Sequence, residues 1–288
     1  MKKVFYIVLS VSAILFVSCG GNENKTAENE NVAADSLQTA PKDTTPVTVD
    51  ETTQFKFDFA VANIPSPAQI VNNFSQGGSA YNTSLLNNLD NTKKYTTNFE
   101  KSIALGVYNL DMSYAIAYNN GADMMKYFKT SMTEADALGL KSAIDQSMGK
   151  RAQDNLSNKD SLFKLIDQLY TQSDNYLRNN ERVETATHIF VGSWIETLYI
   201  ITQSGLTQTE AAQKEKTYKE LWDQRLYLKN LLDLIAEFKT ADSKKLGASL
   251  EPIYKQIEAV KDAKDMDDKT FADITGKIAS LRNQLTKN

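Results

Sequence analysis

Two acidic residues stand out because each lies in the middle of an otherwise apolar stretch of sequence. They are Asp111 and Glu196. A buried carboxylate must be ion-paired, hydrogen-bonded or protonated, because an unpaired buried charge costs several kcal/mol. If the two carboxylates face each other, they could share a proton or bind a cation or small ligand, as in acid–base pairs. The alternative is a structural ion pair, for which Arg151 and Arg182 are candidate partners.

The two apolar stretches themselves are predicted to be central helices. Residues 103–118 and 188–201 are apolar around nearly their whole circumference, which is typical of helices buried in a protein or in a membrane. A charged residue costs about 2.5–3.5 kcal/mol at the centre of a bilayer, so we favour burial within the protein. Small residues, among them Gly106 and Gly192, would let the two helices approach closely.

Aromatic side chains on the same stretches are candidates for the wall of a ligand groove. They are Tyr108, Tyr114, Tyr118, Trp194 and Tyr199. The alternative is core packing, because aromatic residues at helical spacing mostly contribute buried apolar area.

Other catalytic chemistry finds little support in the sequence. The single histidine, His188, has no second histidine to complete a zinc site. Ser193 lies inside a predicted helix and lacks the second glycine of a nucleophile elbow. The sequence has no phosphate-binding loop and no dinucleotide-binding fingerprint. We therefore predict no catalytic residues, no metal and no cofactor.

The N-terminus has the pattern of a bacterial secretory signal. Two lysines precede an apolar run from Val4 to Val17, which is shorter than the roughly 20 residues of a transmembrane helix. The run ends at Ser18-Cys19, and the segment Phe16-Val17-Ser18-Cys19 is similar to the lipobox of lipoproteins. We predict a signal peptide over residues 1–18, a lipid such as palmitate on Cys19, and anchoring in the cell envelope, at the outer membrane or facing the periplasm.

Charge and composition limit the partners of such a protein. Loss of the two lysines of the signal would change the formal net charge from −4 to −6. A mildly acidic chain without a basic stripe argues against nucleic acid as a partner. The predicted partners are the membrane, through the lipid on Cys19, and another envelope protein.

The rest of the chain is predicted to be helical. Residues 19–54 are acidic and Thr-rich with few large apolar side chains, which indicates a disordered tether. Residues 55–61 alternate phenylalanine or valine with polar residues, which is typical of a strand, either an arm lying on the helices or an edge that pairs with another chain. The predicted fold class is all-α, an antiparallel multi-helix bundle with a short extended N-terminal arm. We divide it into a core domain, 55–205, and a C-terminal helical hairpin, 206–288.

Helix boundaries follow from periodicity and from capping residues. Ser66 is placed as an N-cap before Pro67, and residues 207–210 have the spacing of a capping box. Pro252 is expected to start or kink a helix. The other helices are expected at 98–119, 121–138, 141–156, 158–178, 181–203 and 209–239, with a last one carrying apolar residues from 271 to 285.

Three short motifs are distinctive: Ile-Pro-Ser-Pro at 64–67, Ala-Leu-Gly-Val-Tyr-Asn-Leu-Asp-Met-Ser-Tyr at 104–114 and Gly-Ser-Trp-Ile-Glu-Thr-Leu-Tyr at 192–199. Together they resemble a family of uncharacterised all-helical lipoproteins of Bacteroidota-type bacteria, over about residues 55–205. The resemblance implies a helical fold and an envelope location, but no activity.

The sequence therefore favours a lipid-anchored helical protein that acts by binding, as an adaptor or a ligand receptor. The alternative is an envelope enzyme, or a cation or small-ligand site, built on Asp111 and Glu196. A third hypothesis makes the polar hairpin after Gly205 an assembly surface.

Overall fold

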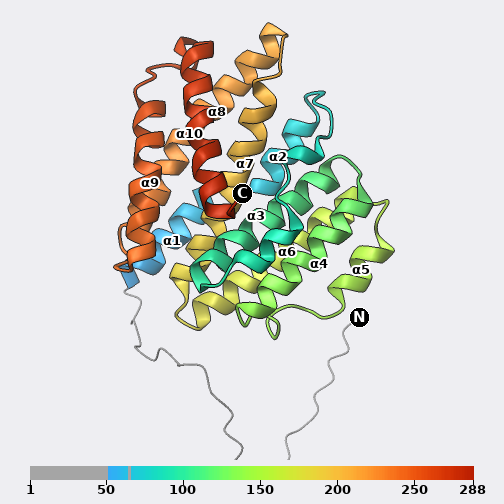
Figure 1. Cartoon of the computed structure of the whole chain (residues 1–288). Coiled ribbons are helices and arrows are strands. Elements are labelled where there is room, and N and C mark those ends of the chain that lie inside the picture. The colour runs from blue at the N-terminus through green and yellow to red at the C-terminus, as the bar shows by residue number, and fades with distance from the viewer. Residues whose placement is uncertain (1–50, 64–65) are drawn as a thin grey trace, which may run out of the picture. The chain divides into compact units, whose positions relative to one another are not determined.

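The fold was obtained as a computed structural model that describes residues 51–63 and 66–288. Cys19, the predicted signal peptide and residues 19–50 of the predicted tether lie outside the described residues. The described part consists of helices and loops without a strand (Figure 1), so the predicted all-α class is confirmed. Its α-helices are α1 Glu51–Asn63, α2 Pro67–Ser75, α3 Asn98–Ala117, α4 Gly121–Ala137, α5 Met148–Asp154, α6 Lys159–Asn179, α7 Val183–Gly205, α8 Ala211–Ile235, α9 Ala241–Glu258 and α10 Asp268–Thr286.

The centre of the bundle is the pair α3 and α7, which are the two apolar stretches of the sequence. Two glycines allow their backbones to meet. A Cβ atom added to Gly106 would lie 2.0 Å from the carbonyl oxygen of Ile189, and one added to Gly192 would lie 2.3 Å from that of Ile103. Only a hydrogen atom fits in either place, so the predicted close approach of these helices is confirmed.

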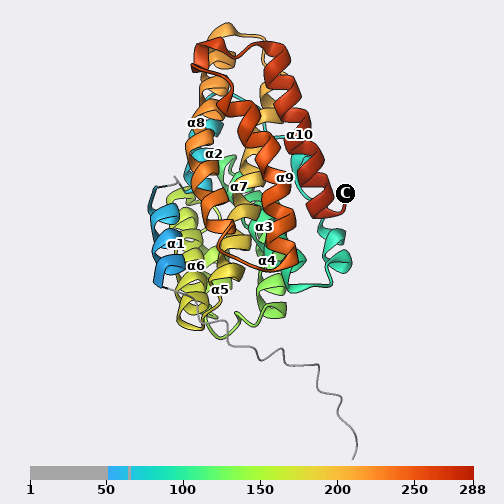
Figure 2. The same cartoon turned by 90° about the vertical axis from the view of Figure 1, so that its left-hand side faces the viewer.

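The remaining helices cover the central pair from two sides. Helices α4 and α6 pack on α3, and α6 also contacts α7. Helices α8 and α10 pack on α7, with α9 resting on both of them. Figure 1 shows the orange and red helices α9 and α10 on the side opposite the green α4 and α5, and in the turned view of Figure 2 α9 lies in front of α4. The first turn of α3 is fixed by a capping box between Thr97 and Glu100.

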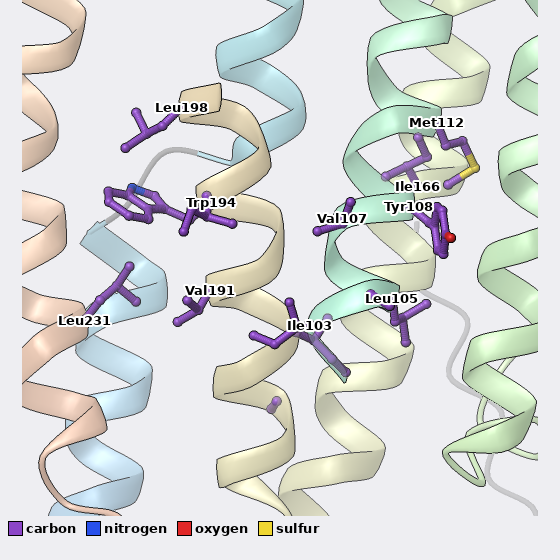
Figure 3. Close-up of a cluster of buried hydrophobic side chains, with 14 of the residues drawn as sticks. Ile103, Leu105, Val107, Tyr108, Met112, Ile166, Val191, Trp194, Leu198 and Leu231 are labelled. Atoms are coloured by element: carbon purple, nitrogen blue, oxygen red, sulfur yellow. The ribbon is translucent and has the colours of Figure 1, made fainter. Parts of the chain in front are cut away.

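One apolar cluster runs through the packed helices. Figure 3 shows how α3 and α7 contribute to it in different directions, with Tyr108 and Met112 on one helix and Val191 and Trp194 on the other. Burying an apolar side chain of this size is worth about 1.5–3 kcal/mol. The cluster also contains Ile278 of α10, so apolar packing is continuous across the domain boundary predicted at residue 205.

The predicted extended arm is wrong, because residues 51–63 form α1. Phe57 is buried in this helix whereas Phe55 and Phe59 are exposed, at 68% and 50%. The polar residues between them are used by other helices: Asp58 accepts from Arg178 of α6 at 2.8 Å, and Lys56 pairs with Glu237. A strand needs a partner strand, and the described residues offer none. The predicted tether is correspondingly too long by residues 51–54, which form the first turn of α1.

Three other boundaries differ from prediction for local reasons. The helix expected at 141–156 is only α5, because the side chain of Asp145 accepts from the backbone N–H of Ser147 at 2.8 Å and holds a turn. Helix α8 begins after Glu210 without a side-chain cap, so no capping box forms at 207–210. Pro252 lies inside α9 on its exposed side, where water can replace the missing hydrogen bond.

Among the helices of residues 51–63 and 66–288, none is long and apolar enough to cross a bilayer.

Candidate functional site

The structure brings Asp111 of α3 and Glu196 of α7 together in a buried carboxylate cluster, whose third member is Arg282 of α10. Both carboxylates are 0% exposed. Arg282 donates to Glu196 through Nε at 2.8 Å and through Nη2 at 2.7 Å, which is a bidentate ion pair. Asp111 accepts at Oδ2 from the backbone N–H of Asn87 at 3.0 Å.

The surroundings of the buried carboxylate cluster favour a proton on Asp111. Burial, followed by the negative charge of Glu196, raises the pKa of Asp111 well above its usual range, although Arg282 acts in the opposite direction. Burial and the charge of Glu196 both favour the protonated, neutral form of Asp111. Its Oδ1 accepts no hydrogen bond from a described residue, as expected for the oxygen that carries the proton and donates toward Glu196. The cluster as a whole has no net charge.

The buried carboxylate cluster is closed to solvent and to substrates. Arg282 is covered on one side by the ring of Tyr199, 4.5 Å from its centroid, and Nη2 also reaches the carbonyl oxygen of Leu85 at 3.4 Å. None of its three members lines any of the larger cavities found in the described residues. What the cluster does is join α10 to the central pair of helices.

The predicted arginine partners are wrong. Arg151 lies on α5 at the surface, where it donates to Gln168 at 3.0 Å. Arg182 donates instead to the carbonyl oxygen of Leu138 at 2.9 Å. The bundle selects Arg282, from a helix that the sequence could not place beside Glu196.

The predicted aromatic groove does not form, because its members point to different parts of the core. Trp194 donates from Nε1 to Gln224 of α8 at 3.0 Å, whereas Tyr108 points from α3 toward the opposite side (Figure 3). Tyr114 is fully buried and accepts from the backbone N–H of Asn82 at 3.0 Å. These residues are core side chains, which was the alternative weighed from the sequence.

A second polar cluster joins α7 to α9 and contains residue types found in hydrolases. Ser243 donates from Oγ to Glu184 at 2.6 Å, and Nε2 of His188 lies 2.8 Å from the same Oγ. Since the only hydroxyl hydrogen goes to the carboxylate, Ser243 accepts from the Nε2–H of His188. The imidazole is a donor here, so it cannot take a proton from the serine as a general base does. Burial lowers the pKa of His188 to about 4, which keeps it neutral.

The strongest candidate for a binding site is a cavity of about 370 Å³, which we call the apolar cavity. It lies between α3, α4, α6 and α7, and α1 and α2 also contribute to its lining. Its apolar walls include Leu105, Ala135, Ile144, Leu169, Ile189 and Phe190. Ligand pockets are typically concave and apolar, about 300–1,000 Å³, with a few polar groups that orient the ligand.

Two such polar groups line this cavity without partners. Asn109 and Ser131 are only 3% and 1% exposed. Asn109 Oδ1 and Ser131 Oγ accept or donate no hydrogen bond among the described residues. A buried polar atom left unpaired costs about 1–3 kcal/mol, so a bound molecule that pairs with them would remove this cost.

Asn109 is held in place by a chain of hydrogen bonds across three helices. Ser193 Oγ donates to the carbonyl oxygen of Gly106 at 2.9 Å, and it lies 2.8 Å from the hydroxyl of Tyr170. The side chain of Asn109 faces the same tyrosine hydroxyl and lowers the pKa of Tyr170, as a hydrogen-bond donor does. Burial raises the pKa of Tyr170 to about 12, so the hydroxyl keeps its proton.

Two carboxylates of α6 complete the lining. Asp167 lies three residues before Tyr170 and Asp174 lies four residues after it, each about one helical turn away on the same face. Asp167 is exposed and Asp174 is half-buried, and this partial burial raises the pKa of each. Asp174 is paired with Arg178 at 3.0 Å. Asp167 has no hydrogen bond or ion pair from its carboxylate to any described side chain, and burial is the only influence on its pKa.

Comparison with known proteins gives no further guide to function, since no family model, curated protein or solved structure matches this chain. Within residues 51–63 and 66–288, no group of three or more His, Cys, Asp or Glu side chains is placed to hold a metal ion.

Sequence reasoning missed the apolar cavity. Asn109 lies in the distinctive motif that contains Asp111, but an asparagine draws less attention than a carboxylate in apolar surroundings. The stripe of Asp167, Tyr170 and Asp174 on one face of α6 was a visible signal. Which polar atoms find a partner depends on contacts between helices distant in sequence, and no local pattern encodes them.

Proposed function

We propose that this protein is a lipid-anchored binding protein of the bacterial cell envelope that holds a small, mostly apolar ligand in the apolar cavity. The observation that carries the binding proposal is the pair of unpartnered polar atoms, Asn109 Oδ1 and Ser131 Oγ, in a cavity whose walls are mostly apolar. The anchor rests on the sequence alone, on the signal over residues 1–18 and the cysteine that follows it.

Binding is preferred to catalysis because the charged groups of the buried carboxylate cluster are already paired within that cluster. Arg282 donates to both carboxylate oxygens of Glu196. Burial and the charge of Glu196 favour the protonated form of Asp111. A general acid or base must come within hydrogen-bond reach of its substrate, and none of the larger cavities in residues 51–63 and 66–288 is lined by these residues. The apolar cavity, in contrast, has room for a ligand.

Filling the cavity tests the binding proposal. Ala135 is a buried wall residue, so Ala135→Phe places a ring in the space that a ligand would use. We expect 1-octanol, a neutral apolar probe, to raise the melting temperature of the wild-type protein, because a ligand that binds only the folded state stabilises it. Ala135→Phe should remove this response.

The matched control is Ala272→Phe, an exposed position on α10 that should leave the response intact. The proposal fails if the wild-type protein shows no stabilisation by 1-octanol, or if Ala135→Phe responds as the wild type does.

The lipid anchor has its own test. Radioactive palmitate should label the wild-type protein in bacterial cells, and Cys19→Ala should abolish the label. Continued labelling of Cys19→Ala would place the lipid elsewhere.

A further inference from the structure

We propose that the ligand of the apolar cavity is a small apolar amine, bound as the ammonium ion, whose N–H groups donate to Asn109 Oδ1 beside the carboxylate of Asp167. This inference rests on the proposed binding function and names the chemical class of the ligand. Three features carry it: the direction of a hydrogen-bond chain, the charge of the lining and the size of the apolar space.

The hydrogen-bond chain fixes the polarity of the Asn109 amide. Its end is the carbonyl oxygen of Gly106, which can only accept, so the hydrogen of Ser193 must point toward it. Ser193 Oγ then accepts from the hydroxyl of Tyr170, which leaves that oxygen free to accept from Asn109. Only the Nδ2 of the amide can donate, so Nδ2 faces Tyr170 and Oδ1 is the atom without a partner.

A free Oδ1 selects among ligands by their hydrogen-bonding groups. An amide oxygen only accepts, so it pairs with an N–H or O–H group of a ligand. A carboxylate or phosphate ligand would place an acceptor against an acceptor. The nearby hydroxyl of Ser131 can donate or accept, and therefore does not restrict this choice.

The charges in the lining favour a positively charged donor. Among the described residues, those that line the cavity include Asp167 and Asp174 but neither lysine nor arginine. Arg178, which does not line the cavity, pairs with Asp174 and also with Asp58. Asp167 is left with a carboxylate that has lost part of its hydration without gaining a cation. A ligand ammonium would supply the missing charge.

The apolar walls determine the rest of the ligand. A space of about 370 Å³ lined by leucine, isoleucine, alanine and phenylalanine side chains suits a short alkyl chain or a small ring system. The predicted ligand therefore has an apolar body and one protonated amine.

Three probes with the same chain and different head groups test this inference: octylamine, 1-octanol and octanoate. Isothermal titration calorimetry with the purified full-length protein at pH 7 should show octylamine binding at least about tenfold more tightly than 1-octanol, because charge-assisted hydrogen bonds are about twice as strong as neutral ones. Octanoate should bind most weakly of the three.

Two variants and a control assign the preference to the named groups. Asn109→Leu removes the acceptor, and Asp167→Asn removes the charge; each should lower the affinity for octylamine at least fivefold, and Asp167→Asn should leave that for 1-octanol unchanged. Asp160→Asn changes the same charge at a second exposed position of the same helix, one that does not line the cavity, and should have no effect.

The possible outcomes separate this inference from the binding function on which it rests. Octanoate binding as tightly as octylamine, or equal binding of octylamine by the wild-type protein and Asp167→Asn, would overturn the amine assignment and leave an apolar binding site. If none of the three probes binds the wild-type protein, the proposed binding function itself fails.

Discussion

The two faces of α3 differ in how their buried polar groups are satisfied. Asp111 and Asn109 are separated by one residue, which places their side chains about 200° apart around the helix. Asp111 lies near Glu196 of α7 and Arg282 of α10, and its Oδ2 accepts from the backbone N–H of Asn87. Asn109 faces the apolar cavity, where its Oδ1 meets no protein donor.

The comparison shows that a charged residue in apolar surroundings is a weak indicator of function. Burying a charge is so costly that a folded protein supplies it with partners, and those partners then occupy the groups that a ligand would need. A neutral amide is cheaper to leave unpaired, at about 1–3 kcal/mol. In this bundle the unpaired amide, and not the carboxylate pair, indicates where a ligand would bind.

Breaking the buried carboxylate cluster should have the largest effect on stability. Arg282→Met leaves Glu196 charged and unpaired at 0% exposure, so we expect the free energy of unfolding to fall by about 3–5 kcal/mol. Urea denaturation followed by circular dichroism measures this loss.

A double variant, Arg282→Met with Glu196→Leu, provides the control, because it removes the unpaired charge together with its partner. We expect it to recover most of the lost stability. A loss below about 1 kcal/mol for Arg282→Met alone would show that the ion pair is not sealed from water.

The cluster of His188, Glu184 and Ser243 is a second group of buried polar side chains that are paired with one another, and it should make the stability of the protein depend on pH. The pKa of His188 is about 4 in the folded protein, against an ordinary value of 6.5, because burial outweighs the attraction of Glu184 and Asp242. The unfolded chain therefore takes up a proton first as the pH falls. The contribution of His188 to stability is complete above pH 6.5 and is lost as the pH falls toward 4.

That loss should amount to roughly 3 kcal/mol, since a change of one in pKa corresponds to about 1.4 kcal/mol. The measurement is the difference in unfolding free energy between the wild-type protein and His188→Gln at pH 7 and pH 4. A difference that does not change over this range would mean that the pKa of His188 is the same in the folded and the unfolded protein.

Much of this architecture is predictable from sequence, whereas the site is not. The all-round apolar character of α3 and α7 predicts their central place, and Gly106 and Gly192 predict their close contact. The partner of Glu196 is not predictable, because Arg282 comes from a helix 86 positions away in the chain. Residues 55–61 mislead because an alternation of period two also suits a helix whose polar residues pair with Arg178 of α6 and with Glu237, which follows α8.

A smaller effect on stability than that of Arg282→Met is expected for Asp111→Asn. Burial and the charge of Glu196 favour the neutral form of the Asp111 carboxyl group, and an amide of nearly the same shape replaces that form without loss of charge. We expect the free energy of unfolding at pH 7 to change by less than about 1.5 kcal/mol, the range of one hydrogen bond. A loss comparable with that of Arg282→Met would show that Asp111 is ionised.

The smallest effect on stability is expected for Asn109→Leu. The variant removes the unpaired Oδ1, which favours folding, and also removes the bond from Nδ2 to Tyr170, which opposes it. The two contributions are each about 1 kcal/mol and offset one another. Thermal denaturation should therefore give nearly the wild-type melting temperature, and a large fall would mean that the Asn109 amide is essential to the packing of α3.

The most direct test of the central claim compares the two faces of α3 in a single binding experiment. Calorimetric titration of octylamine into Asp111→Asn and Asn109→Leu, each matched with the wild-type protein, measures which face holds the ligand. We predict wild-type affinity for Asp111→Asn and at least a fivefold loss for Asn109→Leu. Weakened binding by Asp111→Asn together with unchanged binding by Asn109→Leu would contradict the account.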